Sequence, residues 1–135
     1  MSGEFFVDSN IWLYAFMDST SPKHATALQL IDSEGIVLGT QVLNEVCSNL
    51  IRKARYTEAE IQQTIDNFQE RYPILDVTSS AIRQASVLRE SYRFSYWDSL
   101  IIATALEAGC STVYSEDMQD GLRVGGLVIK NPLLG

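Results

Sequence analysis

Short apolar runs alternate along the chain with longer segments in which apolar residues recur at helical spacing. Each short run is bounded by Gly, Pro or polar residues, and it is too short for a buried helix, so we expect a strand. The expected strands are residues 4–7, 36–38, 74–77, 112–114 and 127–129.

The segments between these strands place apolar residues three or four positions apart, as one face of a helix does. Several segments carry helix start or stop signals. Pro22 suits a first turn, Thr57 and Glu60 form a capping box, Thr40 is a suitable N-cap, and Gly109 follows an apolar stretch. The expected helices are, approximately, residues 10–16, 22–35, 41–55, 57–72, 79–92 and 96–108.

Continuously apolar strands that alternate with helices are typical of a parallel sheet covered on both faces. We therefore expect an α/β fold, a three-layer α/β/α sandwich around a central, mainly parallel five-stranded sheet. The chain has 135 residues, and no linker, repeat or low-complexity stretch divides it. Residues 1–135 are expected to form a single domain.

Composition narrows the class of protein. The formal net charge of −7 by itself argues against nucleic acid, because phosphates attract Lys and Arg, but it also allows carboxylates gathered to hold cations. The sequence lacks a signal peptide and any stretch of about 18 apolar residues, so we expect a cytoplasmic protein without a membrane span. Cys47 and Cys110 are expected to be buried thiols, not a disulfide or a zinc pair.

Acidic residues follow several of the expected strands. Ligands of open parallel sheets bind beyond the carboxyl ends of strands, so these positions are candidates for a site. Asp8 directly follows the first strand, and Asp117 follows the fourth. Glu45 lies one turn into the helix after the second strand, and Asp98 lies near the start of the apolar helix 96–108. We expect these four acids to meet at one edge of the sheet.

Each acid also has a purely structural alternative. Asp8 suits an N-cap, Asp98 suits the positive end of a helix dipole, Glu45 suits a surface position, and residues 115–117 suit a polar turn. Asp8 and Asp98 nevertheless stand between apolar residues, where a carboxylate is costly unless it is paired or binds a metal. Clustered carboxylates suit Mg²⁺, and pairs of such ions promote phosphodiester hydrolysis. The acids therefore predict a divalent-metal site.

Basic and aromatic side chains are candidates for holding a nucleic acid strand. Cations at helix ends equally suit the helix dipole, and the aromatic side chains equally suit core or dimer packing. The candidates are Arg52, Lys53, Arg55, Arg83, Arg89 and Arg93, together with Tyr92, Phe94, Tyr96 and Trp97.

Four blocks of the sequence match a known family in order: FFVDSNIWLYAF, LNEV, YWDSLIIATAL and VYSEDMQDG. Together they resemble PIN domains, most closely the VapC-type ribonuclease toxins of prokaryotic toxin–antitoxin pairs. The resemblance covers essentially the whole chain. It implies cleavage of single-stranded or looped RNA with Mg²⁺ or Mn²⁺. It also implies a homodimer and a cognate antitoxin that inserts into the active-site groove.

The resemblance assigns roles to the four acids. Asp8 and Asp98 match direct metal ligands, Glu45 matches the second acid of the family, and Asp117 matches the fourth. Asp117 and Glu45 would bind the metal through water or hold a second ion. Either of these two would orient the attacking water or take its proton.

Neighbouring polar residues receive supporting roles from the same resemblance. Ser115 matches a small hydroxyl residue two positions before the fourth acid, and Asn10 matches a polar residue that braces the first acid. Glu116 lies beside the match without a role of its own. Asp120 is either an additional outer acid or a turn residue.

Two alternatives to a ribonuclease stay open. A phosphoacceptor receiver domain is also α/β, binds Mg²⁺ and would use Lys130, but receivers carry paired acids after the first strand, and Asp8 has no acidic neighbour. The second alternative is a non-catalytic PIN fold kept for binding a partner. The complete set of acids argues against this alternative, and failure to bind metal would favour it.

Overall fold

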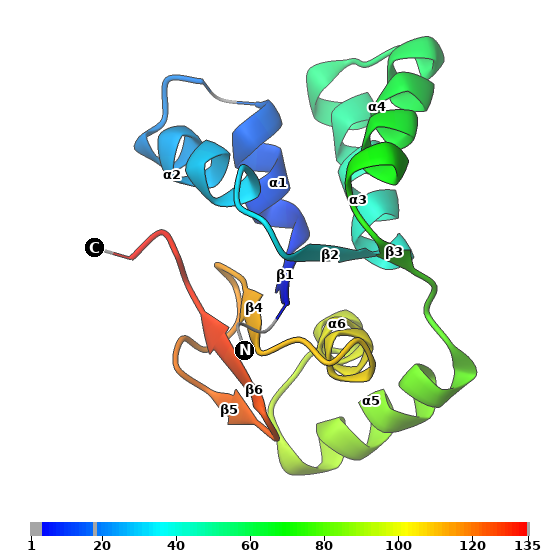
Figure 1. Ribbon diagram of the computed structural model, residues 1–135, viewed down its shortest axis with the longest axis vertical. Coiled ribbons are helices and arrows are strands. Elements are labelled where there is room, and N and C mark those ends of the chain that lie inside the picture. The colour runs from blue at the N-terminus through cyan, green and yellow to red at the C-terminus, as the bar shows by residue number, and fades with distance from the viewer. Residues whose placement is uncertain (1–3, 18, 135) are drawn as a thin grey trace.

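The computed structural model describes residues 4–17 and 19–134, and in this part of the chain six helices surround a six-stranded sheet (Figure 1). The strands are β1 (Phe5–Val7), β2 (Ile36–Gly39), β3 (Ile74–Leu75), β4 (Thr112–Tyr114), β5 (Arg123–Val124) and β6 (Leu127–Lys130). The helices are α1 (Ser9–Phe16), α2 (Pro22–Ile31), α3 (Thr40–Ala54), α4 (Glu58–Arg71), α5 (Ser79–Ser91) and α6 (Tyr96–Glu107).

The expected α/β fold with a mainly parallel central sheet is confirmed. The strand order is β3-β2-β1-β4-β6-β5, and of the described strands β5 alone runs antiparallel to its neighbour. The chain passes from β1 outward to β2 and β3, then crosses back to β4 and β6 on the other side of β1. The direction of winding therefore reverses between β1 and β4, which is where parallel sheets form ligand-binding crevices.

The sheet has one strand more than the five expected. β5 is only two residues long and pairs with β6 through Val124 and Leu127. Gly125 and Gly126 connect the two strands, and Gly125 has a φ of 59°, in the left-handed region that favours glycine. Two glycines between apolar residues are a hairpin signal, so the sequence did carry the information for β5.

The position at which β2 ends explains two smaller differences between the predicted and the observed boundaries of the elements. β3 ends at Leu75 rather than at residue 77, because its partner β2 ends at Gly39. The expected N-cap at Thr40 is wrong: Thr40 is the first helical residue of α3, and Gly39 occupies the cap position without a side-chain hydrogen bond.

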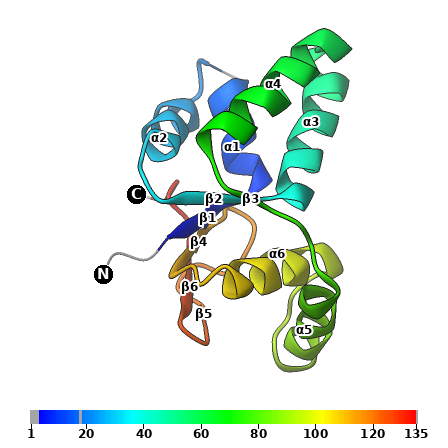
Figure 2. The same ribbon diagram turned by 45° about the vertical axis from the view of Figure 1, so that its right-hand side comes forward.

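The helices form a layer on each face of the sheet. α1 to α4 lie on one face, and α5 and α6 lie on the other, as the two views together show (Figures 1 and 2). α6 lies between the sheet and α5, and its residues 99–105 are all buried. That position explains why its sequence is apolar on all sides.

Helix starts follow the sequence signals closely. Pro22 is the first residue of α2, and the Ser21 hydroxyl accepts a hydrogen bond from the backbone N–H of Lys23. Thr57 and Glu60 form the expected capping box at α4, in which each side chain accepts a hydrogen bond from the other residue's backbone N–H. Such caps stabilise helices locally and are readable before any tertiary contact is known.

Trp12 anchors α1 against the end of α4. Its ring lies edge-to-face with Phe68 and Tyr72, at centroid distances of 4.9 Å and 5.3 Å. Its indole Nε1 donates a hydrogen bond to the carbonyl of Val7, at 3.1 Å. Trp12 is 1% exposed. These contacts fix the first turn of α1 relative to the end of β1, and therefore fix Asp8, which lies between them.

The described residues contain no helix with the length and hydropathy needed to cross a bilayer. Cys47 and Cys110 are free thiols; Cys110 is buried as predicted, whereas Cys47 is only half-buried. Burial raises the pKa of the Cys110 thiol to about 11, so this side chain stays protonated near neutral pH.

Candidate functional site

The four predicted acids lie at the carboxyl edge of the sheet for reasons that the topology supplies. Asp8 follows β1, Asp117 lies just past β4, and Glu45 lies in the second turn of α3 after β2. α6 leads into β4, so it runs back across the sheet and begins at the carboxyl edge, with Asp98 in its first turn. Pairing of β1 with both β2 and β4 brings the four segments together.

Asp8 is the most enclosed of the four acids, at 4% exposed. Its Oδ1 accepts a hydrogen bond from the backbone N–H of Ser9 at 2.7 Å, and its Oδ2 accepts one from the Ser115 hydroxyl at 2.9 Å. It is also the N-cap of α1. From the sequence, helix capping and a role in a site were alternatives for Asp8. In the structure the capping hydrogen bond from Ser9 and the hydrogen bond from Ser115 together orient the carboxylate, so capping does not exclude a role in a site.

The environment of Asp8 disfavours its charged form. Burial raises the pKa of Asp8 to about 6, and the nearby carboxylates of Asp98 and Glu45 add to this effect. The hydrogen bonds from Ser9 and Ser115 act in the opposite direction but do not cancel it. Because the charges of Asp98 and Glu45 both act on Asp8, these three acids share one electrostatic environment.

Glu45 is held by two residues that the sequence reading did not single out. The Ser9 hydroxyl donates to Glu45 Oε2 at 3.1 Å, and Gln41 Nε2 donates to Glu45 Oε1 at 3.3 Å. Ser9 thus contacts Asp8 through its backbone and Glu45 through its side chain. Two sequence features could have identified them: Ser9 is a polar residue directly after Asp8, and Gln41 is a polar residue one helical turn before Glu45.

Asp98 is half-buried at the start of α6. Burial raises its pKa, the negative charge of Asp117 raises it further, and a hydrogen bond with Ser95 lowers it. Ser95 is the N-cap of the helix, and its hydroxyl accepts the backbone N–H of Asp98 at 3.1 Å. The first-turn position expected for Asp98 is confirmed, and its carboxylate lies close enough to Asp117 to feel its charge.

Asn10 supports a different acid from the one expected. The resemblance implied that Asn10 braces Asp8, but its side-chain amide donates to Asp117 Oδ2. Ser115 is the side chain that holds Asp8, and its hydroxyl oxygen also accepts the backbone N–H groups of Asp117 and Met118, both at 3.3 Å. The side chain of Asn10 reaches across to the turn after β4 because β1 and β4 are neighbours. Ser115 and Asn10 thus fix one acid each.

Glu116 and Asp120 do not face the cluster. Glu116 pairs with Lys23, Nζ to Oε2 at 2.6 Å, and accepts the Tyr14 hydroxyl at 2.7 Å. These contacts lower the pKa of Glu116, with Lys23 the larger cause. Asp120 accepts the backbone N–H of Asn131 at 2.8 Å, so it is a turn residue. The contacts of both acids therefore lie outside the group of four acids at the sheet edge.

The donor set fits a divalent cation. The ion pairs among the described residues are Lys23–Glu116 and Arg71–Asp32, so Asp8, Glu45, Asp98 and Asp117 share negative charge without a cationic partner there. All are oxygen donors, which Mg²⁺ and Mn²⁺ prefer. No three acidic, His or Cys side chains of the described chain lie close enough to hold one ion between them. Mg²⁺ binds one or two carboxylates directly and retains several waters, so it does not require three side chains around one ion.

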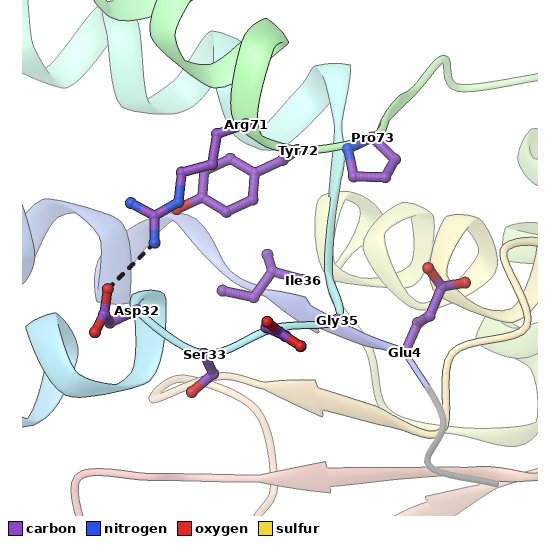
Figure 3. Close-up of a pocket in the computed structure, with 9 residues that line it drawn as sticks. Glu4, Asp32, Ser33, Gly35, Ile36, Arg71, Tyr72 and Pro73 are labelled. Atoms are coloured by element: carbon purple, nitrogen blue, oxygen red, sulfur yellow. Dashed lines mark hydrogen bonds and ion pairs between the residues drawn. The ribbon is translucent and has the colours of Figure 1, made fainter.

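A hollow at the opposite edge of the sheet is separate from this cluster (Figure 3). Arg71 and Asp32 form an ion pair there, Nη2 to Oδ1 at 3.4 Å. The hollow lies where β1 and β2 begin, whereas the acid cluster lies where the strands end. Its lining residues include Glu4, Ser33, Glu34, Gly35, Ile36, Tyr72 and Pro73.

Comparison with known proteins assigns the fold to a family. The PIN domain family model matches residues 5–122. A search of curated protein sequences found no significant match.

Solved structures with the same fold include proteins from three bacteria. VapC20 of Mycobacterium tuberculosis, described as a sarcin-ricin loop cleaving toxin, has a TM-score of 0.68 and 22% identity over 84% of this chain and 90% of its own. A toxin–antitoxin complex from Klebsiella pneumoniae has a TM-score of 0.73 and 17% identity, covering 96% and 98%. VapBC2 from Rickettsia felis, bound to a promoter DNA fragment, has a TM-score of 0.66 and 20% identity, covering 94% and 97%.

Proposed function

This chain belongs to the PIN domain family, and from that membership we propose that it is a divalent-metal-dependent endoribonuclease that hydrolyses RNA phosphodiester bonds in the cytoplasm. One observation carries the proposal: Asp8, Glu45, Asp98 and Asp117 meet at the switch point of the sheet without a cationic partner in the described chain. Asp8 is buried, and a buried carboxylate is costly unless an opposite charge or a metal ion offsets it. The family assignment leaves no support for a receiver domain.

We assign direct metal binding to Asp8 and Asp98. Asp117 and Glu45 would bind the ion through water or would hold a second ion. A bound Mg²⁺ or Mn²⁺ would supply an activated water and would stabilise negative charge at the scissile phosphate. Glu45 or Asp117 orients the attacking water and takes its proton.

The role of the surrounding residues is to hold these carboxylates in fixed orientations. Ser115 and the Ser9 backbone fix the two oxygens of Asp8, and the Ser9 hydroxyl fixes Glu45. Asn10 fixes Asp117. Such supporting hydrogen bonds set the geometry and basicity of metal-ligating groups.

We further propose that the protein is the toxin of a type II toxin–antitoxin pair and that it acts as a homodimer. The similarity to the toxin–antitoxin complex from Klebsiella pneumoniae and to VapBC2 from Rickettsia felis supports this proposal. A cognate antitoxin carrying a basic side chain would neutralise the four acids and occupy the groove. Inhibition would then follow from charge pairing at the site itself.

The direct test is cleavage of a panel of structured RNAs by the purified protein with Mg²⁺, with Mn²⁺ or with chelator. We expect cuts at discrete positions in the two metal lanes and none with chelator, because the carboxylates alone cannot activate water. Melting of the protein with and without Mg²⁺ is measured in parallel. Absence of cleavage together with no Mg²⁺-induced rise in melting temperature would contradict the proposal and favour a non-catalytic PIN fold.

Ser115→Ala is expected to lower the cleavage rate by about tenfold to a hundredfold, the usual cost of losing an outer partner of a metal ligand. The change removes the hydroxyl that donates to Asp8 Oδ2, and this hydrogen bond lowers the pKa of Asp8. A metal-binding carboxylate must be ionised, so the pH at which activity rises should move upward. Ser33→Ala, far from the cluster, is the matched control. A slower variant with an unshifted pH profile would indicate that Ser115 has only a structural role.

A further inference from the structure

A hollow of about 450 Å³ lies beside the acid cluster, between the first turns of α3 and α6. This volume is within the range of small-molecule sites, about 300–1,000 Å³. Its wall combines apolar, aromatic and amide side chains. We call it the Trp97 hollow, and it is lined by Thr40, Gln41, Asn44, Val77, Ile82, Tyr96, Trp97 and Leu100.

Gln41 connects the Trp97 hollow to the carboxylates. Its Nε2 donates both to Glu45 Oε1 at 3.3 Å and to the backbone carbonyl of Trp97 at 3.1 Å. Trp97 immediately precedes Asp98 in the chain. A phosphate held at the acids therefore places the nucleoside attached to it next to this hollow.

Trp97 forms an exposed aromatic surface that neighbouring residues hold in place. It is 62% exposed, which is unusual for a Trp side chain. Tyr96 lies edge-to-face with it at a centroid distance of 5.1 Å. The guanidinium of Arg89 lies 4.5 Å from the centroid of the Tyr96 ring, and its Nη1 donates to the Ser99 hydroxyl at 2.7 Å. An aromatic ring supported in this way offers a flat face to a ligand.

The amides of the hollow have unused hydrogen-bonding capacity. None of the described residues hydrogen bonds to the side chain of Asn44, which is exposed. Gln41 Oε1 is buried and has no hydrogen-bond partner in the described chain. An apolar partner surface would leave these groups unpaired, at a cost of about 1–3 kcal/mol for a buried one by general experience. A ligand with donors and acceptors along its edge would satisfy the exposed amide of Asn44.

We propose that the Trp97 hollow binds the nucleobase adjacent to the scissile phosphate, with Trp97 stacking on the base and Asn44 hydrogen bonding to its edge. A nucleobase has the flat face, the polar edge and the covalent link to a phosphate that these observations require. Asn side chains distinguish bases through paired donor and acceptor atoms. The inference rests on the proposed ribonuclease function and extends it: the hollow selects the base at the cleavage site.

The test that does not depend on cleavage is nuclear magnetic resonance of the two Trp indole N–H groups in the ¹⁵N-labelled full chain. The probes are the 5′-monophosphates of adenosine, guanosine, cytidine and uridine, with Mg²⁺, and ribose 5-phosphate as the probe without a base. We expect the Trp97 signal to shift saturably with at least one nucleotide and to stay unchanged with ribose 5-phosphate. Trp12 is the internal control: its indole is buried and hydrogen bonded to the Val7 carbonyl, so its signal should not shift.

Several results would overturn the inference. One is a Trp97 signal that no nucleotide moves, and another is an equal shift with ribose 5-phosphate. A third is a signal that moves only with protein concentration, which would assign the face to a second copy of the chain. Asn44→Ala should reduce the difference among the four nucleotides, and unchanged differences would remove Asn44 from the proposal.

A cleavage measurement separates this inference from the proposed function. On an RNA that the wild type cuts, Trp97→Leu should lower kcat/KM by about tenfold to a hundredfold, the usual effect of losing one stacked base. Leu28→Ala, an exposed apolar residue of α2, is the control. Equal cleavage by Trp97→Leu at the same sites would overturn the base site and leave the ribonuclease intact. A wild type that cuts nothing and that Mg²⁺ does not stabilise would instead contradict the ribonuclease, and the Trp97 resonance would still report on the hollow.

Discussion

Asp98→Asn is expected to lower metal-dependent RNA cleavage by more than about a hundredfold while the chain stays folded. Loss of an outer partner of a metal ligand costs roughly ten- to a hundredfold, and loss of a direct ligand should cost more. The fold should tolerate the change, because the N-cap hydrogen bond of α6 uses the backbone N–H of residue 98, not its carboxylate. In the wild type, repulsion from Asp117 raises the pKa of Asp98. The substitution removes the charge at residue 98 and therefore also removes this repulsion.

The measurement is the initial rate on an RNA from the panel, with circular dichroism and thermal melting to verify folding. Asp120→Asn is the matched control. Asp120 lies only three residues beyond Asp117, but it accepts a hydrogen bond from the Asn131 backbone, which an Asn carbonyl oxygen can also accept. Wild-type cleavage by folded Asp98→Asn would remove Asp98 from the active site. Equal loss in Asp120→Asn would point to a general effect of charge.

Asp8→Asn is expected to stabilise the metal-free protein at neutral pH while abolishing metal-dependent cleavage. The folded pKa of Asp8 is about 6, above the ordinary value of 3.8, so the folded state holds this proton more tightly than the unfolded state. The resulting cost is absent below pH 3.8, grows between pH 3.8 and 6, and is complete above pH 6. It amounts to about 3 kcal/mol at neutral pH, or on the order of 10 °C in melting temperature.

Melting curves of the wild type and Asp8→Asn between pH 4.5 and 8, with chelator or with Mg²⁺, isolate this contribution. The stability advantage of the variant should grow as pH rises towards 6 and then level off. Mg²⁺ should raise the melting temperature of the wild type at neutral pH and leave that of the variant unchanged, because only an ionised carboxylate binds the cation. A variant less stable than the wild type at pH 7.5 in chelator would show that Asp8 acts mainly as a helix cap.

The combined result of these two variants would be informative beyond either alone. A site that is costly in the folded protein and essential for cleavage is typical of residues retained for function at the expense of stability. If both variants lost activity and neither lost stability, the acid cluster would be functional and not a set of structural caps.

Local elements were largely predictable from the sequence because their signals are local. The apolar sequence of α6, the Thr57–Glu60 capping box and the short apolar runs of the strands are each signals that act within a few residues of the chain. The strand that was missed, β5, also had a local signal in Gly125 and Gly126. The convergence of the four acids was predictable as well, since parallel strands share a carboxyl edge.

Contacts between side chains distant in sequence were not predictable in the same way. The sequence could suggest that Asn10 braces an acid, but the pairing of β1 with β4 decides that the acid is Asp117 and that Ser115 holds Asp8. The sequence likewise left Glu116 and Asp120 open, and their contacts with Lys23 and with the Asn131 backbone resolve both.

By itself, the sequence determined the fold class, the positions of most elements and the identity of the acids that gather at one sheet edge. These follow from the period of apolar residues and from capping rules, which depend on neighbours along the chain. The tertiary structure alone decided which side chains orient each acid, which acids stay unpaired, and that a hollow beside Trp97 adjoins them. Those features depend on how separate elements pack, because contacts between side chains far apart in the sequence have no signal in the local sequence.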